Sequence, residues 1–143
     1  MIKQRNYQLF EIFEEVQNAK TEAQQIKILQ KHKSFELEIV LRAAFRPTIK
    51  FDLPYGAPPF RPDDGDPEQS MNRMSTVVRE LGLLIRGDTR LDSLRKETKF
   101  IGILESVNVK NAKVLVAMKD KELGKLYPNL TVDLINKAFP GVI

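Results

Sequence analysis

Residues 108–119 read NVKNAKVLVAMK, and this stretch decides what kind of fold the chain forms. Asn108 belongs to the residue types that cap helices through a side-chain oxygen. The residues that follow contain no Gly or Pro, and those from Ala112 to Met118 are apolar on most faces of a helix. A helix that is apolar nearly all round must be covered by other elements. We therefore expect it at the centre of a helical domain.

Amphipathic segments lie on both sides of this central stretch. Thr131 is placed to cap a last helix, which Pro140 and Gly141 would end. On the N-terminal side, a helix is expected from Ser70, with an apolar stripe that begins at Met71 and with Gly87 as its left-handed end. These segments repeat their apolar residues at three- and four-residue spacing, as core-facing helices do.

The next segment combines an apolar stripe with many cations. Its expected helix turns Leu91, Leu94, Thr98, Ile101 and Leu104, or the neighbouring Phe100, toward the core. In this register its basic residues lie on or near the exposed side; they are Arg90, Arg95, Lys96 and Lys99.

Three shorter helices are predicted at the N-terminal end. The first spans about 7–19, the second is capped by Thr21, and the third is capped by Ser34 and reaches Phe45. Residues 46–69 then hold six of the eight prolines and cannot sustain a helix. We expect an ordered, Pro-rich wrap over the core, with a mobile, solvated acidic tip at 63–66.

The sequence thus predicts an all-α fold, a compact domain of about seven short helices with one long Pro-rich loop, and a single domain over 1–143. The expected core residues are Ile12, Phe13, Leu41, Phe45, Val78, Leu81, Ile101, Leu104, Leu115, Met118, Ile135 and Phe139. No stretch is long and apolar enough for a membrane span, so we expect a soluble protein that is not exported.

Residue composition argues against catalysis. The chain has no Cys, one His, and no glycine pattern for a phosphate-binding loop. His32 lies in a Lys-rich helix end and is more typical of a surface residue than of a ligand. The tip carboxylates Asp63, Asp64 and Asp66 lack the ligand spacing of a calcium loop. We expect no enzyme, no cofactor, no metal and no small-molecule substrate.

Basic charge gathers in the C-terminal half. Residues 1–69 carry 10 Lys and Arg against 11 Asp and Glu, whereas residues 70–143 carry 13 against 8. An excess of Lys and Arg favours polyanions, because cations near phosphates release condensed counterions.

Two resemblances sharpen this expectation. Through LPYGAPP at 53–59 and AMKDK at 117–121, the chain resembles a family of small proteins of uncharacterised function from T-even-like tailed phages, including cyanophages. Its last five residues, FPGVI, resemble the aromatic-Pro-Gly-Leu-Ile end of the N-terminal helical DNA-binding domain of phage ATP-dependent DNA ligases. The chain contains no Lys-x-Asp-Gly, so ligation does not carry over. The Pro-rich loop and the connection at 121–130 are longer than in those domains.

The ligase resemblance implies a sequence-independent grip on the backbone of double-stranded DNA, by an accessory protein in the host cytoplasm. The candidate DNA-binding residues are Arg90, Arg95, Lys96, Lys99, Lys110, Lys113, Lys119, Lys121 and Lys125.

An alternative is a protein-binding adaptor or inhibitor that docks on a phage replication or host protein. Its surface would be the apolar Pro-rich loop, with Leu53, Tyr55, Pro58 and Phe60. A structural role in the virion is a further alternative.

Overall fold

The fold is built from short capped helices around one apolar core. A computed structural model describes residues 7–143, and 59% of these are helical. The elements in chain order are α1 (Leu9–Asn18), α2 (Glu22–Lys31), α3 (Phe35–Phe45), the 3₁₀ turn η1 (Pro67–Gln69), α4 (Met74–Val77), the 3₁₀ helix η2 (Val78–Leu84), α5 (Ser93–Ser106), α6 (Val109–Lys119), α7 (Leu123–Leu126) and α8 (Val132–Ala138). The predicted all-α fold is confirmed.

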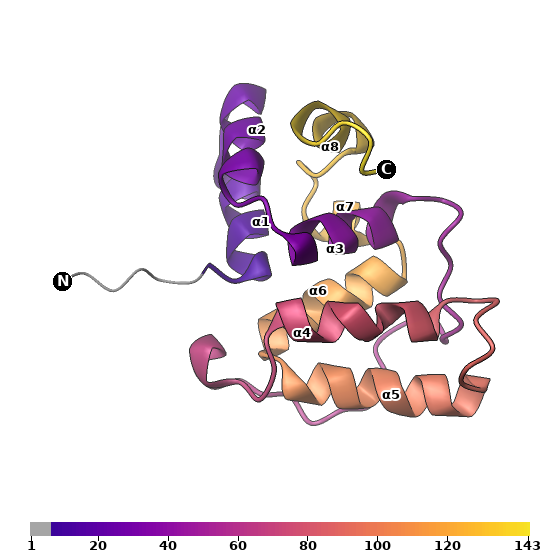
Figure 1. Cartoon of the computed structure of the whole chain (residues 1–143). Coiled ribbons are helices and arrows are strands. Elements are labelled where there is room, and N and C mark those ends of the chain that lie inside the picture. Colours follow the sequence, from indigo (N-terminus) through magenta and orange to yellow (C-terminus); the bar gives the residue numbers. More distant parts are fainter. Residues whose placement is uncertain (1–6) are drawn as a thin grey trace.

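Helix α6 is the central element, as its apolar faces predict. It packs against α1, α3, α5 and α7, while α8 packs on α2 at the far end of the molecule (Figure 1). Ala112, Val114, Leu115 and Met118 are all buried along it. Among the residues predicted as core, only Phe45 and Ile101 remain partly exposed.

The predicted caps explain where several helices begin. The side chains of Thr21, Ser34 and Thr131 accept hydrogen bonds from backbone N–H groups three residues on, and Asn108 accepts one from the N–H of Lys110. These bonds satisfy donors that the first turn of a helix leaves without a partner.

The helix expected from Ser70 begins later than predicted, and most of it is a 3₁₀ helix, which is wound more tightly than an α-helix. The Ser70 hydroxyl donates to Asp63, and the Asn72 N–H donates to the Ser106 carbonyl, so residues 70–73 serve as a tether. The helix starts only at Met74 and continues as η2. Met71, expected on the apolar stripe, is exposed. Gly87 adopts the predicted positive φ, 98°, but it does not end the helix: η2 stops at Leu84 with Ile85 as its cap, and Gly87 lies in the turn that follows.

Residues 7–143 contain no β-strand, only two isolated bridges, Phe51 with Ile85 and Asp63 with Asn108. In the same range no helix combines the length and apolar character that a bilayer crossing requires.

Candidate nucleic-acid interface

Helix α5 turns a different face to the core than the sequence predicted. Lys96, Phe100, Ile103 and Leu104 are buried, whereas Leu94 is 72% exposed. The helix starts at Ser93, with Asp92 as its cap, and its buried residues follow helical spacing from Lys96 onward. The predicted register was therefore wrong.

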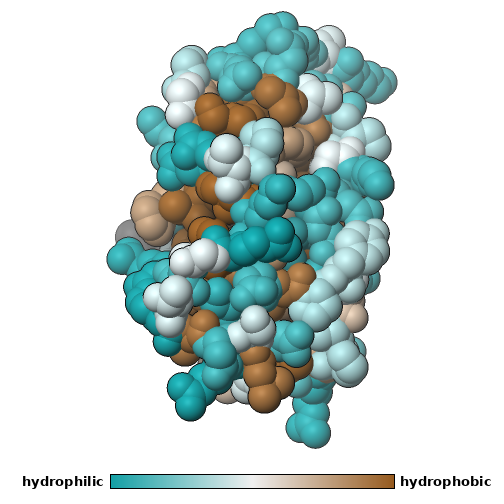
Figure 2. All heavy atoms as spheres, turned by 90° about the vertical axis from the view of Figure 1, so that its right-hand side faces the viewer, coloured by the Kyte–Doolittle hydropathy of each residue, from teal (hydrophilic) through white to brown (hydrophobic). Residues whose placement is uncertain are grey.

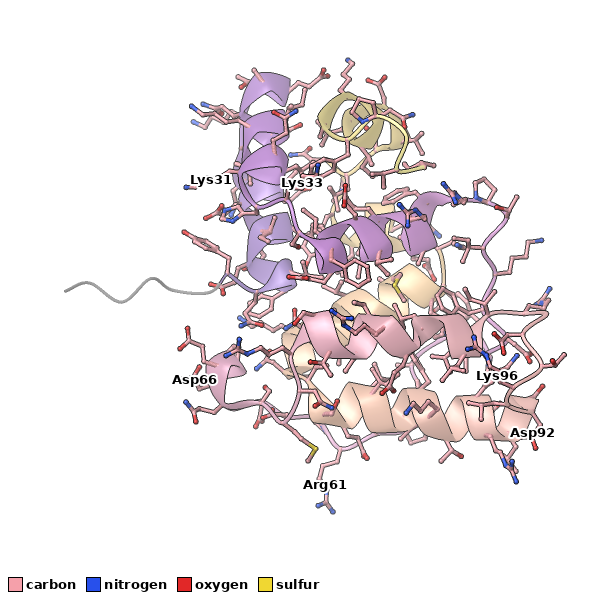
Figure 3. All side chains as sticks on the ribbon, viewed as in Figure 1. Lys31, Lys33, Arg61, Asp66, Asp92 and Lys96 are labelled. Carbon is pink, nitrogen blue, oxygen red and sulfur yellow. The ribbon has the colours of Figure 1, made fainter. Side chains whose placement is uncertain are left out.

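This register places the Lys96 side chain inside the protein, only 2% exposed. Its ammonium group donates to the carbonyls of Asp88 (2.7 Å) and Ile85 (3.1 Å) and to the Asp52 carboxylate (3.3 Å) (Figure 3). Hydrogen bonds from Ser93 and Lys96 lower the pKa of Asp52 below its usual range. Lys96 is thus a tie between three segments, and the prediction that it faces phosphates is wrong.

Lys119 is also buried, at the end of α6. Its ammonium group donates to the carbonyls of Pro54 (2.8 Å) and Gly56 (3.0 Å) and pairs with Asp120. The lysine holds the Pro-rich loop onto the helix. Its ammonium group is occupied by these partners, so Lys119, like Lys96, is poorly placed to meet a phosphate.

Lys121 reaches back over the end of α3. Its ammonium group donates to the carbonyls of Ala43 and Arg46, and burial lowers its pKa. This side chain completes the C-terminus of α3, where helix carbonyls lack internal partners. It is poorly placed to hold a phosphate as well.

Four further candidates have carboxylate partners. Arg90 binds Asp88 at 2.5 Å, Lys99 binds Glu80 at 2.6 Å, Lys125 lies 3.5 Å from Glu122, and the Arg95–Asp92 distance is 3.8 Å. The Arg90 hydrogen bonds lower the pKa of Asp88 to about 2. Exposed pairs of this kind bind weakly, so a polyanion can still compete for the cations.

Lys110 and Lys113 are exposed on the first turns of α6, and no carboxylate within residues 7–143 pairs with either. The Lys110 ammonium lies 5.3 Å from the centre of the Phe10 ring. These two are the candidates that the structure leaves most open to a phosphate.

The Pro-rich loop is held down along its length. Asp120 accepts the Gly56 N–H, and Tyr55 donates its hydroxyl to Glu122, which raises the pKa of Tyr55 and lowers that of Glu122. The Tyr55 ring itself is 78% exposed, while Leu53, Pro58 and Phe60 are half-buried. The predicted wrap over the core is confirmed.

The acidic tip, expected to be mobile, is instead held by hydrogen bonds to the start of α6. Asp63 accepts hydrogen bonds from the Val109 N–H (2.7 Å) and from Ser70, and the Asn108 amide donates to the Gly65 carbonyl. Across the described range, no group of three or more His, Asp or Glu side chains has the arrangement of a metal site. His32 lies 3.7 Å from Glu15 and contacts Tyr7.

Figure 2 shows the side of the molecule where Figure 3 places Asp92 and Lys96. Hydrophilic residues cover most of this side, and hydrophobic ones surface in separate patches between them. The surface therefore resembles a solvated face more than a broad apolar contact area.

Comparison with known proteins identifies a family but no activity. A family model described as a family of unknown function (DUF6433) matches residues 12–125. No curated protein and no solved structure matches the chain.

Proposed function

The chain belongs to the family whose model covers residues 12–125, and from its geometry we propose that it is a non-catalytic DNA-binding protein. It holds the phosphate backbone of double-stranded DNA, largely without regard to base sequence, through Lys and Arg of its C-terminal half. An accessory role in a tailed phage, acting in the host cytoplasm, is part of the same proposal and rests on the resemblances of the sequence.

One observation supports this proposal above the others: cations stand at the positive ends of the two longest helices of the C-terminal half. Beyond their caps, Asp92 and Asn108, the first turns of α5 and α6 contain no acidic residue, and they contain Arg95 and Lys110. In contrast, the first turns of α1, α2, α3 and α8 all contain Asp or Glu.

A cation near a helix N-terminus is opposed by the helix dipole, which favours anions there. Such an arrangement adds nothing to folding, whereas it attracts a phosphate through both the side chain and the helix end. The exposed side chains that support the proposal are Lys110 and Lys113, with Arg90, Arg95, Lys99 and Lys125 available once their carboxylate partners are displaced.

The test is an electrophoretic shift with a DNA duplex at low salt. The double variant Lys110→Glu, Lys113→Glu should bind roughly tenfold or more weakly, because it replaces two phosphate contacts by repulsion. Its fold should be kept, since acidic residues suit the first turn of α6. The matched control, Lys20→Glu with Lys27→Glu in the N-terminal half, should change duplex affinity much less. The absence of any shift by the native protein would end the proposal.

A second candidate function, docking on a phage replication or host protein, is favoured by the exposed Tyr55 ring. Beside it, the loop and α5 enclose a pocket of about 320 Å³ lined by Leu53, Pro58, Phe100 and Ile101. Glu97 lies at this pocket and has no ion pair in the described chain. Pull-downs from infected cells test this docking. A partner protein that the Tyr55→Ala variant no longer binds, but that the Arg61→Ala variant still binds, would support it. Copurification with virions would favour a structural role.

A further inference from the structure

A second surface with unpaired cations lies where the N-terminal helices meet residues 67–75. A groove of about 780 Å³ runs between the end of α2, the start of α3 and the segment from η1 to α4. Figure 3 shows Lys31 above this region and Asp66, next to η1, below it. Ile12, Leu9 and Met74 form its apolar floor.

Cations without carboxylate partners surround this groove. Lys31 and Arg73 line it, Lys33 is adjacent to the lining residues His32 and Ser34, and no ion pair joins any of the three to an acid within residues 7–143. Glu36 and Glu68 are the carboxylates that line it. Because its cations are not neutralised by direct pairing, they are free to meet a phosphate.

Two exposed aromatic residues lie at or next to the groove: Tyr7 lines it, whereas Phe35 is not a lining residue but stands between two that are, Ser34 and Glu36. Tyr7 lines the groove, is 43% exposed and contacts His32, with ring centres 4.4 Å apart and ring planes tilted by 47°. Phe35, which follows the lining residue Ser34, is 52% exposed, and the Arg79 guanidinium lies 5.4 Å from its ring centre. Exposed rings interleaved with Lys and Arg offer faces on which unpaired bases stack.

We propose that this groove binds a single strand of nucleic acid, with Lys31 and Arg73 on the phosphates and Phe35 and Tyr7 against the bases. A duplex cannot use the rings in this way, because its bases are already stacked and paired. The groove is of the size that holds a small ligand, which suits a short part of a strand. The inference rests on the proposed function only in that both ligands are nucleic acids. It assigns single-stranded nucleic acid to this groove and double-stranded DNA to the cations of the C-terminal half.

The experiment measures fluorescence anisotropy of the full chain with a labelled oligothymidine of about 12 nucleotides, a length that covers such sites. Lys31→Glu with Arg73→Glu should weaken binding roughly tenfold or more. Phe35→Ala should weaken it roughly fivefold or more, and Phe35→Trp should restore it, because stacking needs only a ring face. Glu36→Gln with Glu68→Gln should strengthen binding about twofold or more, since it removes repulsion from the phosphates. Circular dichroism checks that each variant is folded.

Lys110→Glu with Lys113→Glu is the reciprocal control, because it should leave oligothymidine affinity nearly unchanged while it weakens duplex binding. The groove proposal is overturned if the native chain binds duplex but not oligothymidine, or if the Lys31 and Arg73 variant binds oligothymidine as the native chain does. Binding of oligothymidine through the groove, without any duplex binding, would instead overturn the proposed function and leave the groove proposal standing.

Discussion

At the scale of single residues, the Lys96 ammonium group shows how a charge comes to lie inside this protein. Three acceptors from two loops converge on it, namely the carbonyls of Ile85 and Asp88 and the carboxylate of Asp52. A buried ammonium is tolerated when its donors are all used and an opposite charge is near. The periodicity of a sequence cannot predict this arrangement, because the acceptors lie on two loops outside the helix.

Replacing Lys96 by Met should therefore destabilise the protein by about 2 kcal/mol or more, because it leaves three acceptors without their donor. Urea denaturation measures the loss. The matched control is Arg95→Met on the exposed side of the same helix, which should change stability by about 0.5 kcal/mol or less. Equal stability of the two variants would show that the contacts of Lys96 contribute nothing.

Asp88 makes stability depend on pH in acid. Its pKa falls from 3.8 to about 2 in the folded protein, chiefly because the Arg90 side chain donates to its carboxylate. A depressed pKa stabilises the fold above 3.8, and that contribution disappears as pH falls to about 2. The melting temperature of the native protein should exceed that of Asp88→Asn near neutral pH, with a difference that shrinks over this interval. A difference that stays constant with pH would contradict this assignment.

At the scale of elements, the caps were predictable and one register was not. Thr21, Ser34, Asn108 and Thr131 begin helices as the sequence indicated, because capping depends on neighbours in the chain. The sequence of α5 is compatible with two apolar stripes, one that includes Leu94 and one that includes Phe100. The buried cation at Lys96 decided between them, and a pattern that counts every lysine as exposed selects the wrong one.

The two stripes of α5 can be told apart by mutation. Phe100→Ala should cost about 3 kcal/mol or more, because it empties a buried site, whereas Leu94→Ala should change stability by about 0.5 kcal/mol or less. Chemical denaturation of both variants measures the difference. A larger cost at Leu94 than at Phe100 would restore the register that the sequence suggested.

At the scale of the whole molecule, the net charge of each half was a coarse guide to function. Of the nine predicted DNA contacts, Lys96 and Lys119 tie loops down, while Lys110 and Lys113 remain exposed without a carboxylate partner. The groove at Lys31 and Arg73 was missed, since it joins segments about forty residues apart, one from each half of the chain, and Glu36 and Glu68 equal its two lining cations in number. Its one local signal was an exposed aromatic, Phe35, directly after the lysines at 31 and 33.

The salt dependence of duplex binding reports how many cations truly meet phosphates. The logarithm of the binding constant falls with the logarithm of salt concentration by about 0.9 for each phosphate neutralised on a duplex. Lys110→Gln with Lys113→Gln should therefore reduce that slope by about 1.8 if both residues contact the backbone. Lys99→Gln should reduce it by less than 0.9 (about one contact at most), because Glu80 competes for its ammonium group at 2.6 Å. Fluorescence titrations over a salt series measure the slopes, and an unchanged slope in the Lys110 and Lys113 variant would place the duplex on another face of the molecule.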